Sequence, residues 1–175
     1  MLIDVSKIIA KPDGSYNEQL ECDMTCFSYC GESYEISACT PIGVKITSKG
    51  NRKALISLRT TISLFIPCDR CLTPVENSFD IDYSREIDFN ENSSDRIDNM
   101  DELNFINGTE FDVNQLICDE IIIDFPLQVL CDEDCKGLCK VCGVNLNNTT
   151  CDCDRADKDI RMSVISDIFK NFKEV

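Results

Sequence analysis

The stretch CDEDCKGLCKVCGVNLNNTTCDC, residues 131–153, contains six of the 13 cysteines in the chain. Cys139 and Cys142 are separated by two residues and are followed by a glycine. This spacing is typical of a zinc knuckle, because two such thiolates can bind one ion from the same side while glycine lets the backbone turn toward them. Cys151 and Cys153 follow after an asparagine-rich turn. The four thiolates could complete a tetrahedron, so the sequence predicts a metal site formed by these residues.

The remaining cysteines of this stretch are Cys131 and Cys135, whose spacing would let them replace Cys151 or Cys153 as ligands. The chain has no histidine, so sulfur would be the ligand atom, and closed sites of that kind are structural. Disulfides are the alternative, but they require an oxidising compartment. The N-terminus lacks the basic and apolar regions of an export signal. We therefore expect structural zinc in a cytoplasmic protein.

A further Cys-x-x-Cys motif lies outside this stretch, at Cys68 and Cys71. The two thiols could share a site with Cys139 and Cys142 or form a second, separate pair at a sheet edge. They could also be the active dithiol of a redox enzyme, because Arg70 between them could lower a thiol pKa. A thioredoxin-type site has a helix behind it, however, and the sequence shows no helix signal there.

Acidic residues dominate the composition, with 32 Asp and Glu against 17 Lys and Arg and a formal net charge of -15. Direct binding of naked nucleic acid is disfavoured, because each phosphate contact needs a cationic side chain. An acidic surface attracts basic proteins, including ribosomal proteins, although it can also serve solubility alone. No apolar run approaches the roughly 18 residues that a membrane span requires.

Residues 41–90 alternate between apolar and polar positions, as expected for antiparallel strands with one buried face. The alternating positions are Ile42, Val44 and Ile46; Ile56, Leu58, Thr60, Ile62, Leu64 and Ile66; and Val75, Phe79, Ile81, Tyr83, Ile87 and Phe89. Acidic residues occupy the opposite face of the last run, among them Glu76, Asp80, Asp82 and Asp88, and this face could be a docking surface for a basic partner. The predicted fold is α+β, a curled antiparallel sheet or open barrel with packed helices and a cysteine-rich zinc-binding segment.

The length of 175 residues suits a single domain. We divide it into an N-terminal segment (1–40), antiparallel strands (41–90), an acidic loop (91–110), a helix and connection (111–130), the cysteine-rich segment (131–153) and a C-terminal helix (159–173). In the first segment we expect a short helix or edge strand, and Cys22, Cys26 and Cys30 as ordinary core or half-buried thiols. Asp112 resembles an N-cap with Gln115 completing a capping box, and Pro126 ends that helix.

From about residue 41 to its end the chain resembles the bacterial YceD family, the large ribosomal RNA subunit accumulation proteins. The resemblance rests on the order of four motifs: CDRCLTP (68–74), FDV (111–113) leading to DFPL (124–127), CKGLCKVCGVNLN (135–147) and CDC (151–153). The chain differs in having Ile160 where the family has proline, and in its N-terminal cysteines. The resemblance also favours Cys68 and Cys71 as a separate pair, because family members can carry that motif without the cysteine-rich tail.

The resemblance implies a non-enzymatic factor that supports the synthesis, processing or stability of 23S ribosomal RNA. Because the charge disfavours direct RNA binding, the partners would be basic proteins, among them ribosomal proteins or precursor large-subunit particles. Two alternatives stay open: a zinc-stapled protein-interaction domain unrelated to ribosomes, and a thiol redox protein that uses Cys68 and Cys71.

Overall fold

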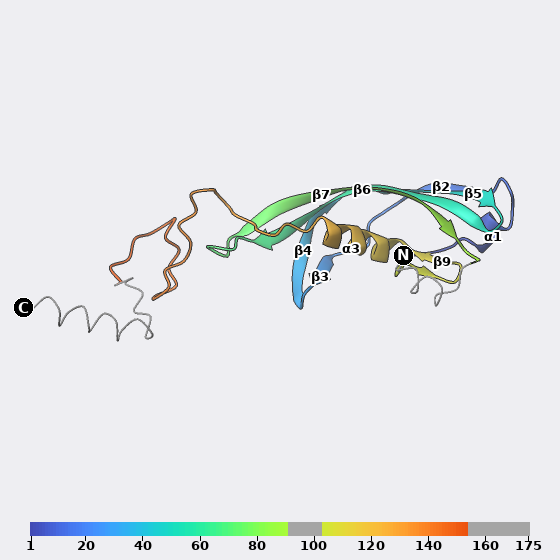
Figure 1. The fold of residues 1–175 in the computed structure, drawn as a ribbon. Helices are drawn as coiled ribbons and strands as arrows, with labels where there is room; N and C mark the ends of the chain where they lie inside the picture. The colour runs from blue at the N-terminus through green and yellow to red at the C-terminus, as the bar shows by residue number, and fades with distance from the viewer. Residues whose placement is uncertain (91–102, 154–175) are drawn as a thin grey trace, which may run out of the picture.

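Strand β6 is the centre of the fold in the computed structural model, which describes residues 1–90 and 103–153. Six antiparallel strands form the main sheet: β2 (Ser15–Leu20), β3 (Cys26–Tyr29), β4 (Glu32–Cys39), β5 (Ile42–Gly50), β6 (Lys53–Pro67) and β7 (Pro74–Asp88). β6 pairs with β7 along its whole length. On its other side, β6 pairs first with β5 and then with β4, and these two strands lead to the edge strands β2 and β3. The result is an open curved sheet that does not close into a barrel (Figure 1).

The predicted alternation is confirmed in the buried face of this sheet. Ile42, Val44, Ile46, Ile56, Leu58, Ile62 and Leu64 have no exposed surface, and Phe79, Ile81 and Ile87 are also buried. The strands β5 and β6 meet at Asn51 and Arg52, whose φ angles of 51° and 56° fit the tight turn of a two-residue hairpin. β5 continues to Gly50 through a bulge after Ser48.

Helix α3 (Val113–Ile123) packs its apolar side into the same core. It lies beneath the concave side of the sheet, with Val113, Leu116, Ile117 and Ile121 fully buried (Figure 1). The helix ends at Ile123, three residues before Pro126, as the sequence predicted. The described part of the chain is therefore mostly antiparallel sheet, with two helices: α3 and the single-turn α1 (Ser6–Ile9).

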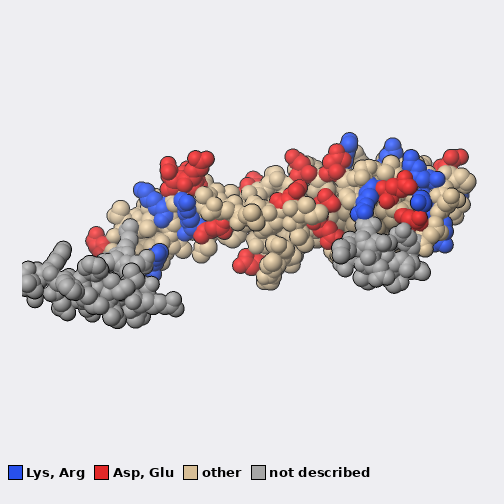
Figure 2. Space-filling model, viewed as in Figure 1, with Lys and Arg blue, Asp and Glu red and all other residues tan. Residues whose placement is uncertain are grey.

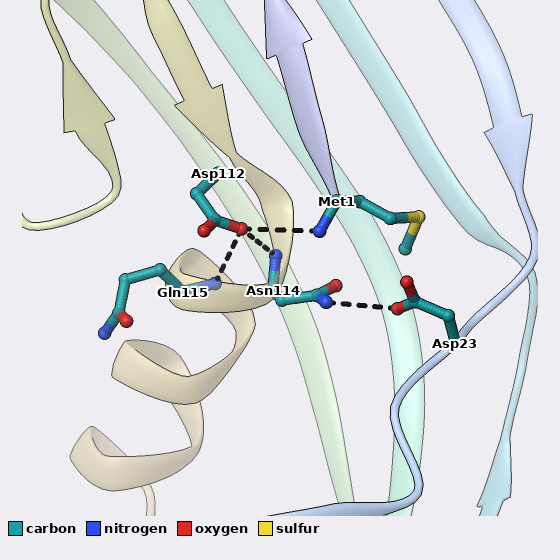
Figure 3. A network of polar contacts seen from close by, with 5 residues as sticks. All are labelled: Met1, Asp23, Asp112, Asn114 and Gln115. Carbon is teal, nitrogen blue, oxygen red and sulfur yellow. Dashed lines mark hydrogen bonds and ion pairs between the residues drawn. The ribbon is translucent and has the colours of Figure 1, made fainter.

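Asp112 caps α3 as predicted, but the capping box does not form. Its carboxylate accepts hydrogen bonds from the N–H groups of Asn114 (3.0 Å) and Gln115 (3.4 Å), and it lies 3.6 Å from the N-terminal ammonium of Met1 (Figure 3). The Gln115 amide instead donates to Asp119, one turn along the helix. The N-terminus is thus tied to the helix start through Asp112.

The N-terminal residues form both of the elements that the sequence left open. β1 (Leu2–Asp4) joins a second, three-stranded sheet with β9 (Glu110–Asp112) and β8 (Ile106–Asn107), and α1 follows β1. Cys26 begins β3 and Cys30 lies in the next turn. Both are exposed, so the expectation that they are at least half-buried holds only for Cys22.

Two further predictions concern the acidic loop at 91–110 and the C-terminal helix at 159–173. The predicted acidic loop included residues 103–110, yet these contain β8 and the start of β9. The rest of that loop, 91–102, and the predicted C-terminal helix, 159–173, lie outside the described residues. No helix in the described part of the chain is long and apolar enough to cross a membrane.

Candidate metal centre

Eight cysteines gather into two groups of four beyond the end of the β6–β7 hairpin. The first, here called the proximal cluster, consists of Cys68, Cys71, Cys131 and Cys135. The second, the distal cluster, consists of Cys139, Cys142, Cys151 and Cys153. Figure 1 shows the cysteine-rich segment extending from the end of β6 and β7, opposite the end that carries α1. Each cluster offers four sulfur ligands at one point.

The spacing of the sulfurs fits a tetrahedral thiolate site. Within each cluster the sulfurs all lie within 4.8 Å of one another. In the proximal cluster, Cys68 Sγ lies 3.9 Å from Cys135 Sγ, and Cys71 Sγ lies 3.5 Å from Cys131 Sγ. Four sulfurs at about 2.3 Å from a central zinc ion would be roughly 3.8 Å apart. These distances are far longer than the ~2.05 Å of a disulfide. Both clusters can therefore hold a metal ion.

The first two ligands of each cluster lie on turns with the same backbone pattern. In the proximal turn, the Cys68 N–H donates to Thr73 O and the Cys68 carbonyl accepts from Leu72 N–H. In the distal turn, the Cys139 N–H donates to Val144 O and the Cys139 carbonyl accepts from the N–H of the following glycine. The residue after the second cysteine is left-handed in both, with φ of 58° at Leu72 and 73° at Gly143. The chain thus builds the knuckle turn twice.

The turns direct N–H groups at sulfur and so favour thiolates. Burial raises the pKa of Cys68, but backbone N–H groups, led by that of Arg70, outweigh this effect and lower the pKa from 9.0 to about 6. Backbone N–H groups, led by that of Cys142, likewise lower the pKa of Cys139 to about 6. A metal ligand must be deprotonated, so these turns prepare one thiolate in each cluster for an ion.

The pKa is raised, not lowered, at one ligand of each cluster, Cys131 and Cys153. Hydrogen bonding to Cys71 is the largest cause that raises the pKa of Cys131 to about 12. Hydrogen bonding to Cys142 raises that of Cys153 to about 12 in the same way. A thiol that shares its proton with a neighbouring thiolate holds it more tightly. Metal binding would release these protons, since the cation takes over the role of holding the thiolates together.

The two residues between the first proximal ligands attach the cysteine-rich segment to the sheet. Asp69 exchanges two hydrogen bonds with Val129, one from each main-chain N–H. The Arg70 guanidinium donates to the carbonyls of Glu133 (3.2 Å) and Cys135 (2.9 Å). We expected the Arg70 side chain to act on the thiols electrostatically. It donates hydrogen bonds instead to the backbone of the segment that carries Cys131 and Cys135.

Asn147 connects the two clusters. Its side-chain oxygen accepts from the Lys136 N–H (2.7 Å), and its amide donates to Cys135 Sγ (3.3 Å). A side chain from the distal loop therefore orients a proximal ligand, as second-shell residues do in metal sites. The sequence analysis treated Asn147 only as part of a turn, because its partner lies 12 residues away and no spacing rule relates them.

The structure gathers the predicted ligands in an arrangement that differs in part from the one their spacing suggested. The four residues predicted as the main site lie together in the distal cluster. Cys131 and Cys135 do not lie there as alternates, since they face the end of the sheet. Cys68 and Cys71 are not a separate pair, because those same two cysteines join them. With Cys68 fully buried and Cys71 5% exposed, the geometry also gives no support to a redox dithiol.

The exposed face of β7 is a second candidate site, because it carries the carboxylates predicted as a docking surface. Asp80 accepts a hydrogen bond from Thr61 (2.8 Å), and Asp82 forms an ion pair with Arg59 (3.0 Å). Figure 2 shows acidic side chains along the middle of the visible face, where Lys and Arg are sparse. The carboxylates are therefore held in place by β6 and remain accessible.

The other two predicted carboxylates lie toward opposite ends of β7. Glu76 is exposed and accepts a hydrogen bond from Ser37 (2.6 Å) in β4. Asp88 is half-buried and pairs with Lys53 at 3.2 Å. Since Asp82 and Asp88 already face cations, Glu76 and Asp80 carry most of the uncompensated charge of this group.

Comparison with known proteins gives one family and several relatives. The family model described as large ribosomal RNA subunit accumulation protein YceD matches residues 56–169. A protein of Arabidopsis thaliana, named large ribosomal RNA subunit accumulation protein YCED homolog 1, chloroplastic, is 42% identical over 50 residues, which are 29% of this chain and 16% of the plant protein.

Two further relatives give similar partial matches. The Zea mays protein of the same name is 37% identical over 62 residues, 35% of this chain and 21% of the relative. An uncharacterized protein of Mycobacterium tuberculosis is 30% identical over 79 residues, 45% of this chain and 38% of the relative. The chain thus matches less than two fifths of the length of each relative. No solved structure matched.

Proposed function

The chain belongs to the YceD family of large ribosomal RNA subunit accumulation proteins, and on this premise we propose that it is a non-enzymatic factor that supports 23S ribosomal RNA. The observation that carries the proposal is the family match, which extends from β6 through both cysteine clusters. The description of the family names the accumulation of a ribosomal RNA subunit and no reaction. The absence of histidine further reduces the groups that could transfer protons near neutral pH.

We infer that the protein acts through a basic protein partner bound to the exposed face of β7. Its net charge of -15 repels phosphate and attracts cationic surfaces, such as those of ribosomal proteins and precursor large-subunit particles. Glu76 and Asp80 lie on a rigid strand paired to β6 along its whole length. A partner that docks there meets fixed charges, so little conformational entropy is lost on binding. The association weakens as salt rises, because interactions between exposed charges are screened beyond about 8 Å at physiological ionic strength.

The test reverses these two charges. In Glu76→Lys with Asp80→Lys, the fold and the metal content stay unchanged, co-purification with ribosomal proteins or precursor particles falls, and the ratio of 23S to 16S RNA in cells falls with it. The control, Asp13→Lys with Glu110→Lys, makes the same change of net charge at exposed positions away from β7, in the turn before β2 and in β9 of the second sheet.

Two outcomes contradict the proposal. If both variants lower co-purification equally, net charge alone is responsible and the β7 face is no docking site. Tight, salt-sensitive binding of the purified protein to naked 23S RNA contradicts the inferred protein partner.

We also propose that the distal cluster holds structural zinc. Four thiolates with no other ligand type, at the spacing of a tetrahedron, suit zinc and form a closed site without an open position for catalysis. Zinc would hold the loop at residues 139–153 in place. Native mass spectrometry should detect the ion, and blocking the thiols should release it. Metal-free protein with undiminished thermal stability would contradict the assignment.

A further inference from the structure

We propose that the proximal cluster is a second zinc site, which fastens the cysteine-rich segment to the end of the β6–β7 hairpin. Its ligands are Cys68 and Cys71 from the hairpin and Cys131 and Cys135 from the segment. The proposal does not depend on the ribosomal role or on zinc in the distal cluster. It gives each chain two ions with different tasks.

The first support is the ligand geometry. Two sulfur pairs, Cys68 with Cys135 at 3.9 Å and Cys71 with Cys131 at 3.5 Å, each join one sulfur of the hairpin to one of the segment. These values bracket the ~3.8 Å expected between thiolates around one zinc ion. An ion at their centre would therefore bind both parts of the chain at once.

The second support is the shared turn. The backbone pattern at Cys68 to Thr73 matches that at Cys139 to Val144, including the left-handed residue after the second cysteine. Leu72 takes that conformation although it costs a non-glycine residue roughly 1–2 kcal/mol, and its side chain is 64% exposed and gains little from burial. The surrounding contacts must compensate for that strain. A metal bound by Cys68 and Cys71, which precede Leu72 in the same turn, provides such compensation.

The third support is that the described residues form no other adequate core at this junction. The buried residues of the hydrophobic cluster here are Cys68, Cys71 and Cys135, with Val75, Leu130 and Leu138 packed partly against them. So small an apolar cluster does not usually fix a segment without a disulfide or a metal. The hydrogen bonds of Asp69 and Arg70 orient the segment, and the ion would supply the missing stabilisation.

An ion can also reach this site. A cleft beside the cluster is lined by Thr73, Cys131, Asp132, Asp134 and Cys135. Cys131 is itself exposed, whereas the other three ligands are buried. The carboxylates of Asp132 and Asp134 at the opening favour approach of a cation. The site is thus closed on the side of the sheet and open to exchange on the other.

Zinc per chain, measured by elemental analysis of protein purified without chelator, tests the proposal. We expect two ions in the wild type, one in Cys68→Ser with Cys71→Ser, and one in Cys139→Ser with Cys142→Ser. The control Cys26→Ser removes an exposed thiol outside both clusters and should keep two ions.

The outcomes separate this site from the distal one. A count that does not fall in Cys68→Ser with Cys71→Ser overturns the proximal site, whether the wild type holds one ion or two. A single wild-type ion that is lost in that variant but kept in Cys139→Ser with Cys142→Ser supports the proximal site and overturns the distal one. A wild type without zinc overturns both.

Cobalt titration of the metal-free wild type keeps the proposal testable if a variant fails to fold. Thiolate-to-cobalt absorption should rise up to two equivalents, and an endpoint at one equivalent should occur in Cys131→Ser. A wild-type endpoint at one equivalent, unchanged in Cys131→Ser, overturns the proposal.

Hydrogen exchange gives a second readout that reports the fastening itself. The amides of Asp69 and Leu138, which bond Val129 O and Arg70 O across the junction, should exchange faster when the proximal thiols are replaced. They should keep their protection when Cys139 and Cys142 are replaced. Equal effects of the two variants contradict the assigned division of tasks.

Discussion

Replacing Gly137 by alanine should loosen the junction between sheet and cysteine-rich segment more than the same change at Gly143. Both glycines have φ of 73°, so alanine costs roughly 1–2 kcal/mol at either position. They differ in their surroundings. A Cβ at Gly137 would lie 2.8 Å from the Arg70 carbonyl oxygen, whereas a Cβ at Gly143 meets nothing within 4 Å.

The magnitude of the difference follows from one hydrogen bond. The Arg70 carbonyl accepts from the Leu138 N–H at 2.9 Å, and it must move to admit the new methyl group. Losing that bond costs about 0.5–1.5 kcal/mol. The total for Gly137→Ala is therefore about 2–3 kcal/mol, and the excess of about 1 kcal/mol over Gly143→Ala corresponds to roughly a fivefold larger opening constant.

Hydrogen exchange at the Leu138 and Asp69 amides, with metal bound, measures this opening. Gly137→Ala should accelerate exchange at both amides about fivefold relative to Gly143→Ala. The amides in the middle of β6 serve as the control and should exchange alike in the two variants. If Gly143→Ala accelerates exchange at Leu138 as much as Gly137→Ala does, the close approach of Gly137 to Arg70 does not contribute to the junction.

Three further changes test the fold. Asp112→Ala removes the cap of α3 and should lower the free energy of unfolding by about 1 kcal/mol in a urea titration, with Asp112→Asn largely restoring it. Leu116→Ala should cost about 2–5 kcal/mol because the side chain has no exposed surface, while Ile122→Ala, 40% exposed on the same helix, should cost clearly less; similar values would mean that α3 does not pack on the sheet. Asp82→Ala removes an ion pair with Arg59 whose side chains are 64% and 78% exposed, so thermal unfolding should shift little, and a loss well above 1 kcal/mol would show a structural role for this pair.

The strands and their buried face could be predicted from the sequence because the alternation of apolar and polar residues shows which side of a strand is buried. Ile56 and Phe79 follow that rule without exception. Alternation says nothing about which strands are neighbours, however. The division of β6 between β5 and β4 depends on contacts distant in sequence, so a barrel and an open sheet were equally compatible with the pattern.

The same limit explains why the spacing of the cysteines predicted one cluster and not the other. The distal cluster is local, with all ligands between Cys139 and Cys153, and spacing alone brought them together. The proximal cluster joins residues that only the β6–β7 hairpin places side by side, so spacing misassigned Cys131 and Cys135. Gln115 failed as a capping partner for a related reason, since the Asp112 N–H that a capping box would direct to the Gln115 side chain donates instead to the Phe105 carbonyl.

The separation of the proximal ligands along the chain has a consequence for synthesis. Cys131 follows Cys71 by 60 residues. At about 5–20 residues per second, a ribosome completes the first pair of thiols roughly 3–12 seconds before it begins the second. During that interval the nascent hairpin can already form, but its end presents half a binding site with reactive sulfurs. Fastening of the segment is therefore a late, high-contact-order step, and a reducing environment during translation determines whether it succeeds.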